Sequence, residues 1–501
     1  MFKILRPRAS ANLQNRIYKD VSLRNLINSY LILTFSRYDI IIDNFDRILN
    51  LTKKIIGNNA MFWMLGNTVG RQFTGGNTIS HVEDTCKELS KNNFHIAVNY
   101  LAEYMAEYNT DEFFDLNCQR YIDTFKIANS VGDLNFFNAI KLSGMIDINL
   151  LQKMNKVQNR LESLFWNVPN IRIGPKGYFV SRDLLEQEIM KVTGLSKNDI
   201  DEYLSLVKIK HENDNIYLIE WNLQSNCYTI KNEHIKNHIV YKTLTGYSEE
   251  DHDSITKFIS RLLLIVEEAK CYRSNILVDA EQSYLQKAIY NIVEQLMYHF
   301  NSPDFYFIFN TVQNYTIESV NLINYELHKL EFFENQYPLM IKMVRGAYLD
   351  EESHISEAQG YPVCWSNKEL TDYAFDKNSL KLIKSNAKYK KILIATHNDD
   401  SLKLMGDALV ECENQPEFNR QEEVKIRDQV YFATLLGLND YIAYKSLEDR
   451  FATIKYIPYG ENHITLPYLM RRGKECRNLI QKSNREIKSI KQELWNRLTF
   501  K

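Results

Sequence analysis

The chain lacks the cysteine pairs, the long apolar runs and the basic excess that would each indicate a distinct class of protein. Its seven cysteines include no CxxC pair, and their odd number favours a reducing compartment over a disulfide framework. The spacing also argues against zinc ribbons and iron–sulfur ligation. No segment reaches the ~18 uncharged apolar residues of a membrane span. A net charge of −2 argues against nucleic-acid binding.

Several catalytic motifs are absent as well. The sequence contains no Ser–His–Asp ordering, no zinc-binding pair of histidines on a helix, no P-loop and no GxGxxG. Hydrolase, metalloprotease and nucleotide-triphosphate functions therefore have no support, and we expect no metal site.

The chain does contain enough apolar residues for a large core, since they make up 45% of its 501 positions. Eight short runs rich in Val, Ile, Phe and Tyr are each followed by a segment of helical period. They are "FHIAVNYL" (94–101), "FFNAIKLS" (136–143), "NILVDAE" (275–281), "FYFIFNTVQ" (305–313), "LMIKMVRGAY" (339–348), "KILIATHN" (391–398), "QVYFATLLG" (429–437) and "TIKYIPYG" (453–460). This alternation predicts an α/β fold, a (βα)8 barrel of the TIM type.

Polar residues gather at the C-terminal ends of these runs, where α/β barrels build their active sites. They are Asn99, Lys141, Asp279, Glu281, Asn310, Gln313, Arg345, Thr396, His397 and Tyr456. Taken singly, each could be an ordinary strand ending. Together with Lys342 they describe a basic pocket with hydrogen-bonding groups, which suits a large anionic cofactor and a small acid.

The ends of the chain and one connection differ from a plain barrel. Residues 1–19 carry five cations and no acid, as in a mitochondrial transit segment or a short basic tail. We expect a helical region over 20–90, the barrel over 91–145 and 251–485, an insertion over 146–250 and a C-terminal helix over 486–501. The longest uncharged run, 55–70, is interpreted as a buried, broken segment.

The predicted insertion contains two units, each with the pattern of a helix, a short loop, a strand-like pair and a second helix. This outline is that of an EF-hand pair. Calcium requires alternating Asp/Asn oxygen ligands and a closing glutamate, which are missing from the first loop and incomplete in the second. We therefore interpret the insertion as a degenerate EF-hand-like helical module for packing or for an unknown partner.

Near the C-terminus, "YLMRRGKE" (468–475) allows two interpretations. Two adjacent arginines with a glutamate one turn later can be a solvated helix face, with an ion pair worth a few tenths of a kcal/mol. They can also bind a carboxylate, because planar guanidinium groups suit bidentate recognition.

Nine motifs in register resemble those of the proline dehydrogenase family, eukaryotic mitochondrial type. They are "RQFTGG", "VNYLAEY", "AIKLSG", "NILVDAEQ", "FIFNTVQNY", "IKMVRGAYL", "ILIATHND", "IPYG" and "YLMRRGKECR". The resemblance covers about 60–145 and 250–485, and it implies a distorted (βα)8 barrel with FAD across the carboxyl ends of the strands. The long insertion then lies between strands 2 and 3.

The resemblance also implies roles for single residues. Those expected to contact FAD are Asp279, Asn310, Gln313, Lys342, Arg345, Gly346, Ala347, Tyr348, Thr396, His397 and Asn398. Those expected to bind proline are Lys141, Tyr456, Tyr468, Arg471, Arg472 and Glu475. Arg471 and Arg472 would hold the proline carboxylate, Glu475 would fix their rotamers, and Lys342 would lie near flavin N5.

The implied reaction is oxidation of L-proline to Δ1-pyrroline-5-carboxylate, the first step of proline catabolism, by hydride transfer from C5 to flavin N5. Electrons would pass to ubiquinone, with peripheral association on the matrix side of the mitochondrial inner membrane. Asn99 departs from the family, which usually has aspartate there, whereas Glu103 is retained.

Two other functions stay open. Hydroxyproline dehydrogenase uses the same fold and flavin, but in the family a small residue at the position of Tyr456 accompanies hydroxyproline. A barrel that has lost catalysis could instead serve as a scaffold, although the intact "VRGAY" and the Arg471, Arg472 and Glu475 set argue against it.

Overall fold

A computed structural model describes residues 17–38, 44–102, 109–132, 135–207, 214–225, 233–415, 425–475 and 484–499. Most of the predicted basic segment, and Glu103, lie outside these residues. The chain divides into two compact units. Unit 1 comprises Met1–Ile96 and Phe432–Lys501, and unit 2 comprises Ala97–Tyr431.

All eight predicted strands are present. They are β1 (His95–Tyr100), β2 (Phe137–Ile140), β6 (Asn275–Val278), β7 (Ile308–Gln313), β8 (Leu339–Val344), β9 (Lys390–Ala395), β10 (Val430–Leu435) and β11 (Ala452–Tyr459). They close into a barrel in the order β1-β11-β10-β9-β8-β7-β6-β2. The pairings from β1 through β2, β6, β7 and β8 to β9 are parallel. The predicted fold class is confirmed.

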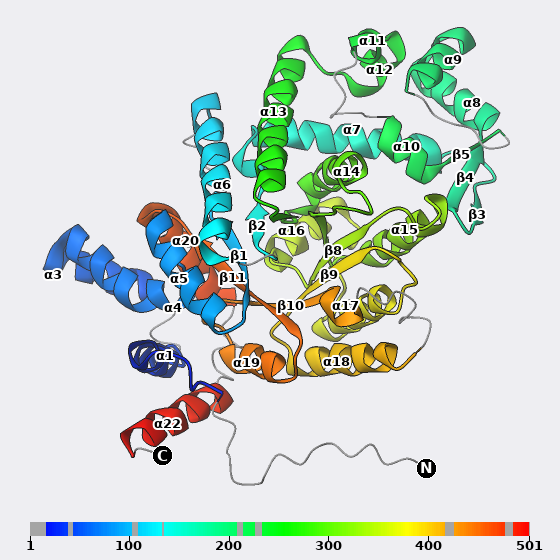
Figure 1. Cartoon of the computed structure of the whole chain (residues 1–501). Coiled ribbons are helices and arrows are strands. Elements are labelled where there is room, and N and C mark those ends of the chain that lie inside the picture. The colour runs from blue at the N-terminus through cyan, green and yellow to red at the C-terminus, as the bar shows by residue number, and fades with distance from the viewer. Residues whose placement is uncertain are drawn as a thin grey trace, which may run out of the picture. The chain divides into compact units, whose positions relative to one another are not determined.

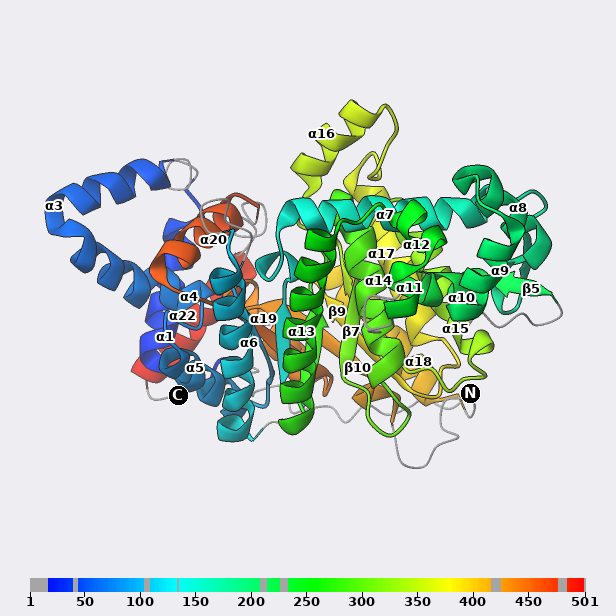
Figure 2. The same ribbon diagram turned by 90° about the horizontal axis from the view of Figure 1, so that it is seen from above.

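Helices follow the strands because each connection must return the chain to start the next parallel strand. In unit 2, the helices outside β6–β9 are α13 (Glu249–Cys271), α14 (Ser283–Phe300), α15 (Ser319–Phe332), α17 (Lys368–Ile383) and α18 (Asp399–Glu413), as Figures 1 and 2 show. Every residue of β2, β6 and β7 is buried, as expected for near-continuous apolar strands covered by helices.

Several strands end earlier than their apolar runs suggest. β2 ends at Ile140, β6 at Val278 and β8 at Val344. Residues at the tips of these runs therefore lie in the loops beyond the carboxyl ends of the strands. Lys141, Asp279 and Arg345 are in this position, where their side chains can make contacts other than those of a strand interior.

The segment between β2 and β6 is mainly helical. It contains α7 (Ile148–Trp166), β3 (Arg172–Gly174), β4 (Gly177–Ser181), α8 (Arg182–Thr193), α9 (Lys197–Leu206), β5 (Asn215–Tyr217), α10 (Leu218–Gln224), α11 (Glu233–Asn237) and α12 (Ile239–Thr245). β4 pairs antiparallel with both β3 and β5, so the two helix–strand–helix units meet through β4 and β5. Among the described residues, no group of three His, Cys, Asp or Glu side chains could hold a metal.

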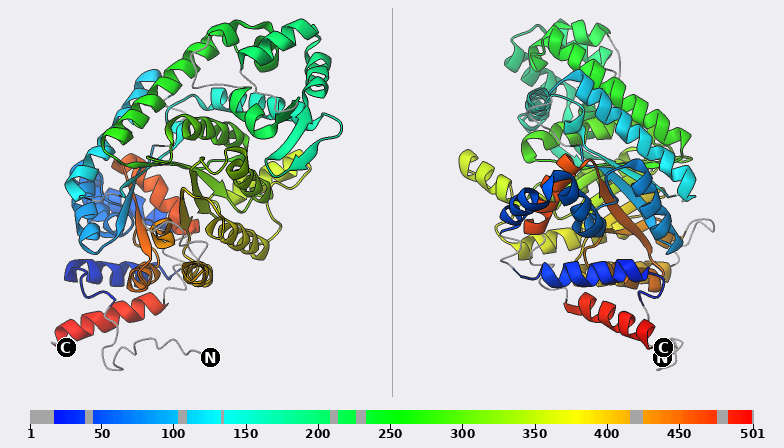
Figure 3. Two further views of the ribbon diagram at one scale, coloured as in Figure 1. Left: turned by 45° about the vertical axis from the view of Figure 1, so that its right-hand side comes forward. Right: turned by 90° about the vertical axis from the view of Figure 1, so that its left-hand side faces the viewer.

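Buried polar contacts fix this segment to a helix of the barrel. Asn155 Oδ1 on α7 accepts hydrogen bonds from the amides of Lys287 and Ala288 on α14. Within the segment, the indole of the fully buried Trp221 donates to the carbonyl of Leu161 at 2.7 Å. Figure 3 shows the segment between β2 and β6 in two further views.

Unit 1 brings together helices from both ends of the described chain. α1 (Leu23–Phe35) packs against α22 (Asn484–Leu498) through a small core that contains Leu26, Leu33 and Ile490. Arg497 of α22 also donates to the carbonyls of Tyr18 and Lys19. The C-terminal helix is therefore held by both apolar and polar contacts.

The interpretation of 55–70 as a buried segment is wrong, although the segment is broken as expected. α3 (Phe45–Leu65) bends at Gly57, where φ is +77°, and continues into a π-helical turn at Gly66–Gly70. Ile55 and Trp63 are each 71% exposed. Only one side of the helix packs against the rest of unit 1, so its apolar sequence did not lead to burial.

Candidate active site

A buried ion pair joins the carboxyl ends of β6 and β8. Lys342 Nζ lies 2.6 Å from Asp279 Oδ1, and the two side chains are 7% and 14% exposed. The structure thus brings two of the predicted site residues into contact. A buried cation is tolerated at this position because a carboxylate lies beside it.

A buried phenol lies beside the same group of charges. Tyr121 of α6 (Asp111–Val131) is fully buried, and its hydroxyl accepts a hydrogen bond from the Lys141 amide at 3.1 Å. Burial raises the pKa of Tyr121, and the carboxylates of Glu281 and Asp279 raise it further, against the effect of the Lys141 charge. Lys141 itself is buried. It therefore belongs to the same charged cluster as Asp279.

Glu281 ties the loop after β2 to the loop after β6. Its carboxylate accepts hydrogen bonds from the Ser143 hydroxyl and from the Ser143 amide, the latter at 3.1 Å. Its carbonyl accepts from Gln313 Nε2 at 2.8 Å. Asn310, also on β7, is buried and donates to the carbonyl of Tyr290. The Gln313 amide thus supports the loop after β6, whereas Asn310, in the middle of β7, binds the covering helix α14.

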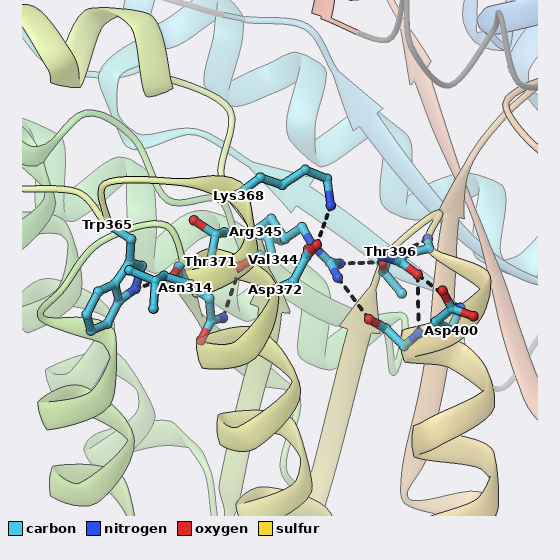
Figure 4. A network of polar contacts seen from close by, with 12 residues as sticks. Asn314, Val344, Arg345, Trp365, Lys368, Thr371, Asp372, Thr396 and Asp400 are labelled. Carbon is cyan, nitrogen blue, oxygen red and sulfur yellow. Dashed lines mark hydrogen bonds and ion pairs between the residues drawn. The ribbon is translucent and has the colours of Figure 1, made fainter.

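Arg345 is the centre of a second polar network, shown in Figure 4. Its Nε donates to Asp372 Oδ1 at 2.6 Å, Nη1 to Thr396 Oγ1 at 2.6 Å and Nη2 to Ser401 Oγ at 2.8 Å. The guanidinium also lies 4.2 Å from the centroid of the Phe375 ring. One side chain after β8 therefore connects the end of β9 with α17 and α18.

The charge of Asp372 is secured by two cations. Partial burial opposes its ionisation, but hydrogen bonds from Lys368 and Arg345 hold the pKa of the carboxyl below its usual value. The carboxylate is thus available to orient Arg345 throughout the neutral pH range.

The turn that follows Arg345 requires glycine. Gly346 has φ of +135°, and a Cβ there would lie 1.6 Å from Cδ1 of Tyr315. The Tyr315 amide donates to the Arg345 carbonyl at 2.7 Å, which fixes the ring against the turn. Ala347 is exposed, and Tyr348 precedes α16 (Leu349–Gln359) as its N-cap residue.

The residues after β9 that were predicted to contact FAD lie at the start of a helix. Asn398 is the N-cap of α18, and its Oδ1 accepts from the amides of Asp400 and Ser401. The Asn398 amide donates to Thr396 Oγ1 at 3.1 Å. His397 lies between them and is half-buried. The segment places a helix N-terminus at the carboxyl end of β9, but Asn398 already caps its amides and Asp399 and Asp400 lie in its first turn, so the chain's own groups satisfy this N-terminus.

Asn99 lies in the first strand, where the family usually has aspartate, and is 4% exposed. Its side-chain carbonyl has no hydrogen-bond partner among the described residues. A buried carbonyl without a donor is costly, so a ligand or a water is the expected source of the missing hydrogen bond.

The predicted substrate residues near the C-terminus belong to unit 1. Tyr456 lies on β11, and Tyr468 is buried on α20 (Asn462–Glu475). The backbone of Arg471, Arg472 and Glu475 is in the last turns of α20, but their side chains lie outside the described part of the structure. Their role in carboxylate binding stays a prediction.

Unit 1 also contains a cavity of about 570 Å³. Its lining includes Gln72, Gly75 and Gly76 of the "RQFTGG" motif, together with Leu469 of α20. Gln72 Nε2 donates to the carbonyl of Gly437 at 3.1 Å, so the motif is anchored to the chain after β10.

Sequence reasoning missed the helix residues that contact the predicted site residues. Tyr121, Asp372 and Ser401 contact Lys141 and Arg345, yet none ends a strand. A tyrosine at a core position of a predicted helix does signal a buried hydroxyl in need of a partner. Asp372 and Ser401 carry no comparable signal, because helix residues of these types are usually solvated.

The comparisons with known proteins agree with this geometry. Residues 82–485, which contain all eight barrel strands, match the family model described as proline dehydrogenase. This chain belongs to the proline dehydrogenase family. The family predicted from the nine motifs is confirmed, and so is its enzyme class, an oxidoreductase.

Two curated relatives illustrate the range within this family. "Proline dehydrogenase 1, mitochondrial" of Dictyostelium discoideum is 25% identical over 492 residues, which cover 97% of this chain and 74% of the relative. "Hydroxyproline dehydrogenase" of Mus musculus is 26% identical over 261 residues, or 51% of this chain and 55% of the relative.

A solved structure supports the fold of this proline dehydrogenase family member. The proline utilization A protein of Bdellovibrio bacteriovorus, inactivated by N-propargylglycine, superposes with a TM-score of 0.53 at 14% identity. The match covers 92% of this chain and 38% of that protein. The same barrel is thus one part of a much longer protein.

Proposed function

We propose that this protein oxidises L-proline to Δ1-pyrroline-5-carboxylate with FAD as its cofactor. The observation that carries the proposal is the family match over the whole barrel, joined to a cluster of cations at its carboxyl ends. Similarity to a mitochondrial proline dehydrogenase over 97% of this chain supports the same substrate.

The donor groups of unit 2 fit an anionic dinucleotide. A guanidinium has five N–H groups, and the hydrogen bonds of Arg345 to described residues use three of them. Two remain for a phosphate. Gly346 is exposed directly after Arg345, and Thr396 accepts a hydrogen bond from the same guanidinium. Together with these groups, the residues that would hold FAD are Asp279, Asn310, Gln313, Lys342, Ala347, Tyr348, His397 and Asn398.

When bound, FAD supplies an electrophilic N5 that accepts a hydride from C5 of proline. Lys342 would lie near that atom and would stabilise negative charge as it develops, because its own charge is held in place by Asp279. Such a fixed charge needs no reorganisation during the reaction.

Proline itself would be oriented by groups at its two ends. The residues that would bind the carboxylate are Arg471, Arg472 and Lys141. Glu475 would fix the rotamers of the two arginines. Tyr456 and Tyr468 would pack against the proline ring. Correct positioning can contribute ~7–11 kcal/mol toward the barrier. The cationic surroundings would also favour loss of the amine proton, which must precede formation of the imine.

We also propose a quinone as electron acceptor and a location on the matrix side of the mitochondrial inner membrane. The names of the mitochondrial relatives and the basic residues 1–19 support this location. No helix among the described residues has the length and apolarity needed to cross a bilayer.

Anaerobic mixing of the purified protein with proline tests the proposal. We expect a yellow protein whose flavin absorbance bleaches on addition of proline. A colourless protein would instead favour the scaffold function. Arg472→Met should raise the proline KM while FAD stays bound, and a variant that purifies without flavin would show that α20 does not serve the substrate.

Hydroxyproline is the second candidate substrate, favoured by the similarity to the mouse hydroxyproline dehydrogenase. The phenol of Tyr456 would crowd a 4-hydroxyl group on the ring. We therefore expect kcat/KM to be higher for proline, and a clear preference for hydroxyproline would reverse the assignment.

A further inference from the structure

Helix α3 exposes a row of large apolar side chains. Ile48, Leu51 and Ile55 follow one another at helical spacing and are 42%, 59% and 71% exposed. Past the bend at Gly57, Trp63 is also 71% exposed. Scattered apolar residues on a surface are normal, but a row of them on one helix indicates a partner.

The opposite side of α3 is already used for packing. Leu49, Met61 and Leu65 are buried together, with Phe62 and Leu466 against them. The helix is therefore attached to unit 1 by one edge, and the exposed row is a separate face. The exposed surface in the first half of the helix also includes Ile56, which is 44% exposed, and the polar residues Arg47, Asn50, Lys53 and Lys54.

The charge of this helix is mainly positive, since α3 has one acid, Asp46, against three cations, Arg47, Lys53 and Lys54. The 36 residues from Arg47 to Val82 contain no aspartate or glutamate, whereas the whole chain has 63 acids in 501 residues. Arg47, Lys53 and Lys54 lie in the first half of α3 and are exposed. The face thus combines apolar side chains with positive charge, which is the combination that binds anionic lipid surfaces.

We propose that α3 docks on the surface of an anionic lipid bilayer. The row Ile48, Leu51, Ile55 enters the boundary between headgroups and acyl chains, and Arg47 and Lys54, which flank the row on the helix, bind lipid phosphates. Trp63 suits the same boundary, because its ring is apolar and its N–H can reach water. The inference rests on the proposed function and deepens it, since a quinone acceptor dissolves in the bilayer.

A second copy of the chain fits this face less well. In an isologous dimer the same patch meets itself. Arg47 and Lys54 would then face the same cations of the other copy, and the sequence of α3 offers one acid, Asp46, against three cations. Anionic headgroups remove this repulsion, so charge favours the bilayer over self-association.

Sedimentation of the full chain with lipid vesicles tests the proposal without substrate. We expect binding to vesicles of phosphatidylcholine with phosphatidylglycerol and little binding to phosphatidylcholine alone. Leu51→Ser with Ile55→Ser should weaken binding by about tenfold or more. Arg47→Gln with Lys54→Gln should abolish the preference for the anionic vesicles and the sensitivity of binding to salt.

The matched control is Leu404→Ser with Val410→Ser on α18, two apolar residues that are 40% and 42% exposed. This variant should bind vesicles like the natural chain. Absence of vesicle binding by the natural chain, or equal loss in the control, would overturn the proposal. So would a dimer in light scattering that only the α3 variants dissociate.

Proline-dependent bleaching in the absence of vesicles separates this proposal from the proposed function. The α3 variants should bleach like the natural chain, because α3 contributes no residue of the proposed active site. A protein that binds vesicles but does not bleach would refute proline oxidation and leave the docking surface intact.

Discussion

Lys342 Nζ and Asp279 Oδ1 lie 2.6 Å apart and link the ends of two strands that are not neighbours in the barrel, β8 and β6. The pair crosses over β7, whose residue Thr311 is opposite Lys342 in the sheet register. A cation at the carboxyl end of the barrel is thus held by a carboxylate from a different βα unit.

Asp279→Asn should destabilise the protein, because it leaves the Lys342 ammonium buried without a counter-charge. Breaking a buried pair costs roughly 3–5 kcal/mol, and the residual exposure of Asp279 places the expected loss at the lower end. Thermal unfolding measures the effect as a lower Tm.

The double variant Asp279→Leu with Lys342→Met provides the control, because it removes both charges. It should recover most of the Tm lost in Asp279→Asn, yet bleach poorly with proline. An unchanged Tm in the single variant would mean that solvent already screens the pair.

The barrel and the positions of many site residues were predictable because they depend on local patterns. Apolar runs such as "KILIATHN" identify a strand and its polar end, and the end of a strand is where a parallel barrel places its site. The partners of Lys342 and Arg345 were not predictable. Asp279, Asp372 and Ser401 are distant in sequence, and no pattern indicates which helix face turns toward Arg345.

The misjudged burial of α3 has a related cause. A helix is buried only if another element covers it, and sequence patterns do not reveal whether such an element exists. The run 55–70 was apolar enough for a core, but within α3 the buried cluster comprises only Leu49, Met61 and Leu65 among the described residues.

Gly346→Ala should disturb the turn after β8. The new Cβ would overlap the Tyr315 ring, and φ of +135° is unfavourable for any residue with a side chain. We expect a lower Tm and a reduced ratio of flavin to protein after purification.

Gly360→Ala is the matched control for Gly346→Ala. Gly360 also has positive φ, +74°, but a Cβ there meets nothing within 4 Å. Its cost should be limited to backbone strain of about 1–2 kcal/mol, with full flavin content. Equal losses in both variants would show that strain, and not the Tyr315 ring, sets the requirement for glycine.

Glu486 should make the docking of α22 sensitive to pH. Burial raises the pKa of this carboxyl to about 8, and the nearby Asp440 adds to the effect. One Glu486 oxygen accepts the Asp440 amide at 2.9 Å. Because the folded pKa exceeds the unfolded value near 4.5, the folded state keeps a proton that the unfolded state releases.

The contribution of this proton to the free energy of unfolding is fully present below about pH 4.5 and is lost as the pH rises toward about 8. Glu486→Gln cannot ionise, so it should gain in Tm relative to the natural chain when the pH is raised from about 5 to about 8. A constant difference in Tm across this range would mean that Glu486 is already charged in the folded protein.

Arg345→Lys should weaken flavin binding although the charge is kept. A lysine cannot reach Asp372, Thr396 and Ser401 in the planar arrangement that the guanidinium achieves. Each hydrogen bond to a charged group contributes about 1.5–3 kcal/mol, so flavin content and Tm should both fall.

Lys368→Met is the control, because Lys368 contacts the same Asp372 carboxylate from a side chain that is 71% exposed, and such surface pairs contribute little. If both variants lost flavin equally, the charge of Asp372, and not the fork of Arg345, would be the feature that organises the network.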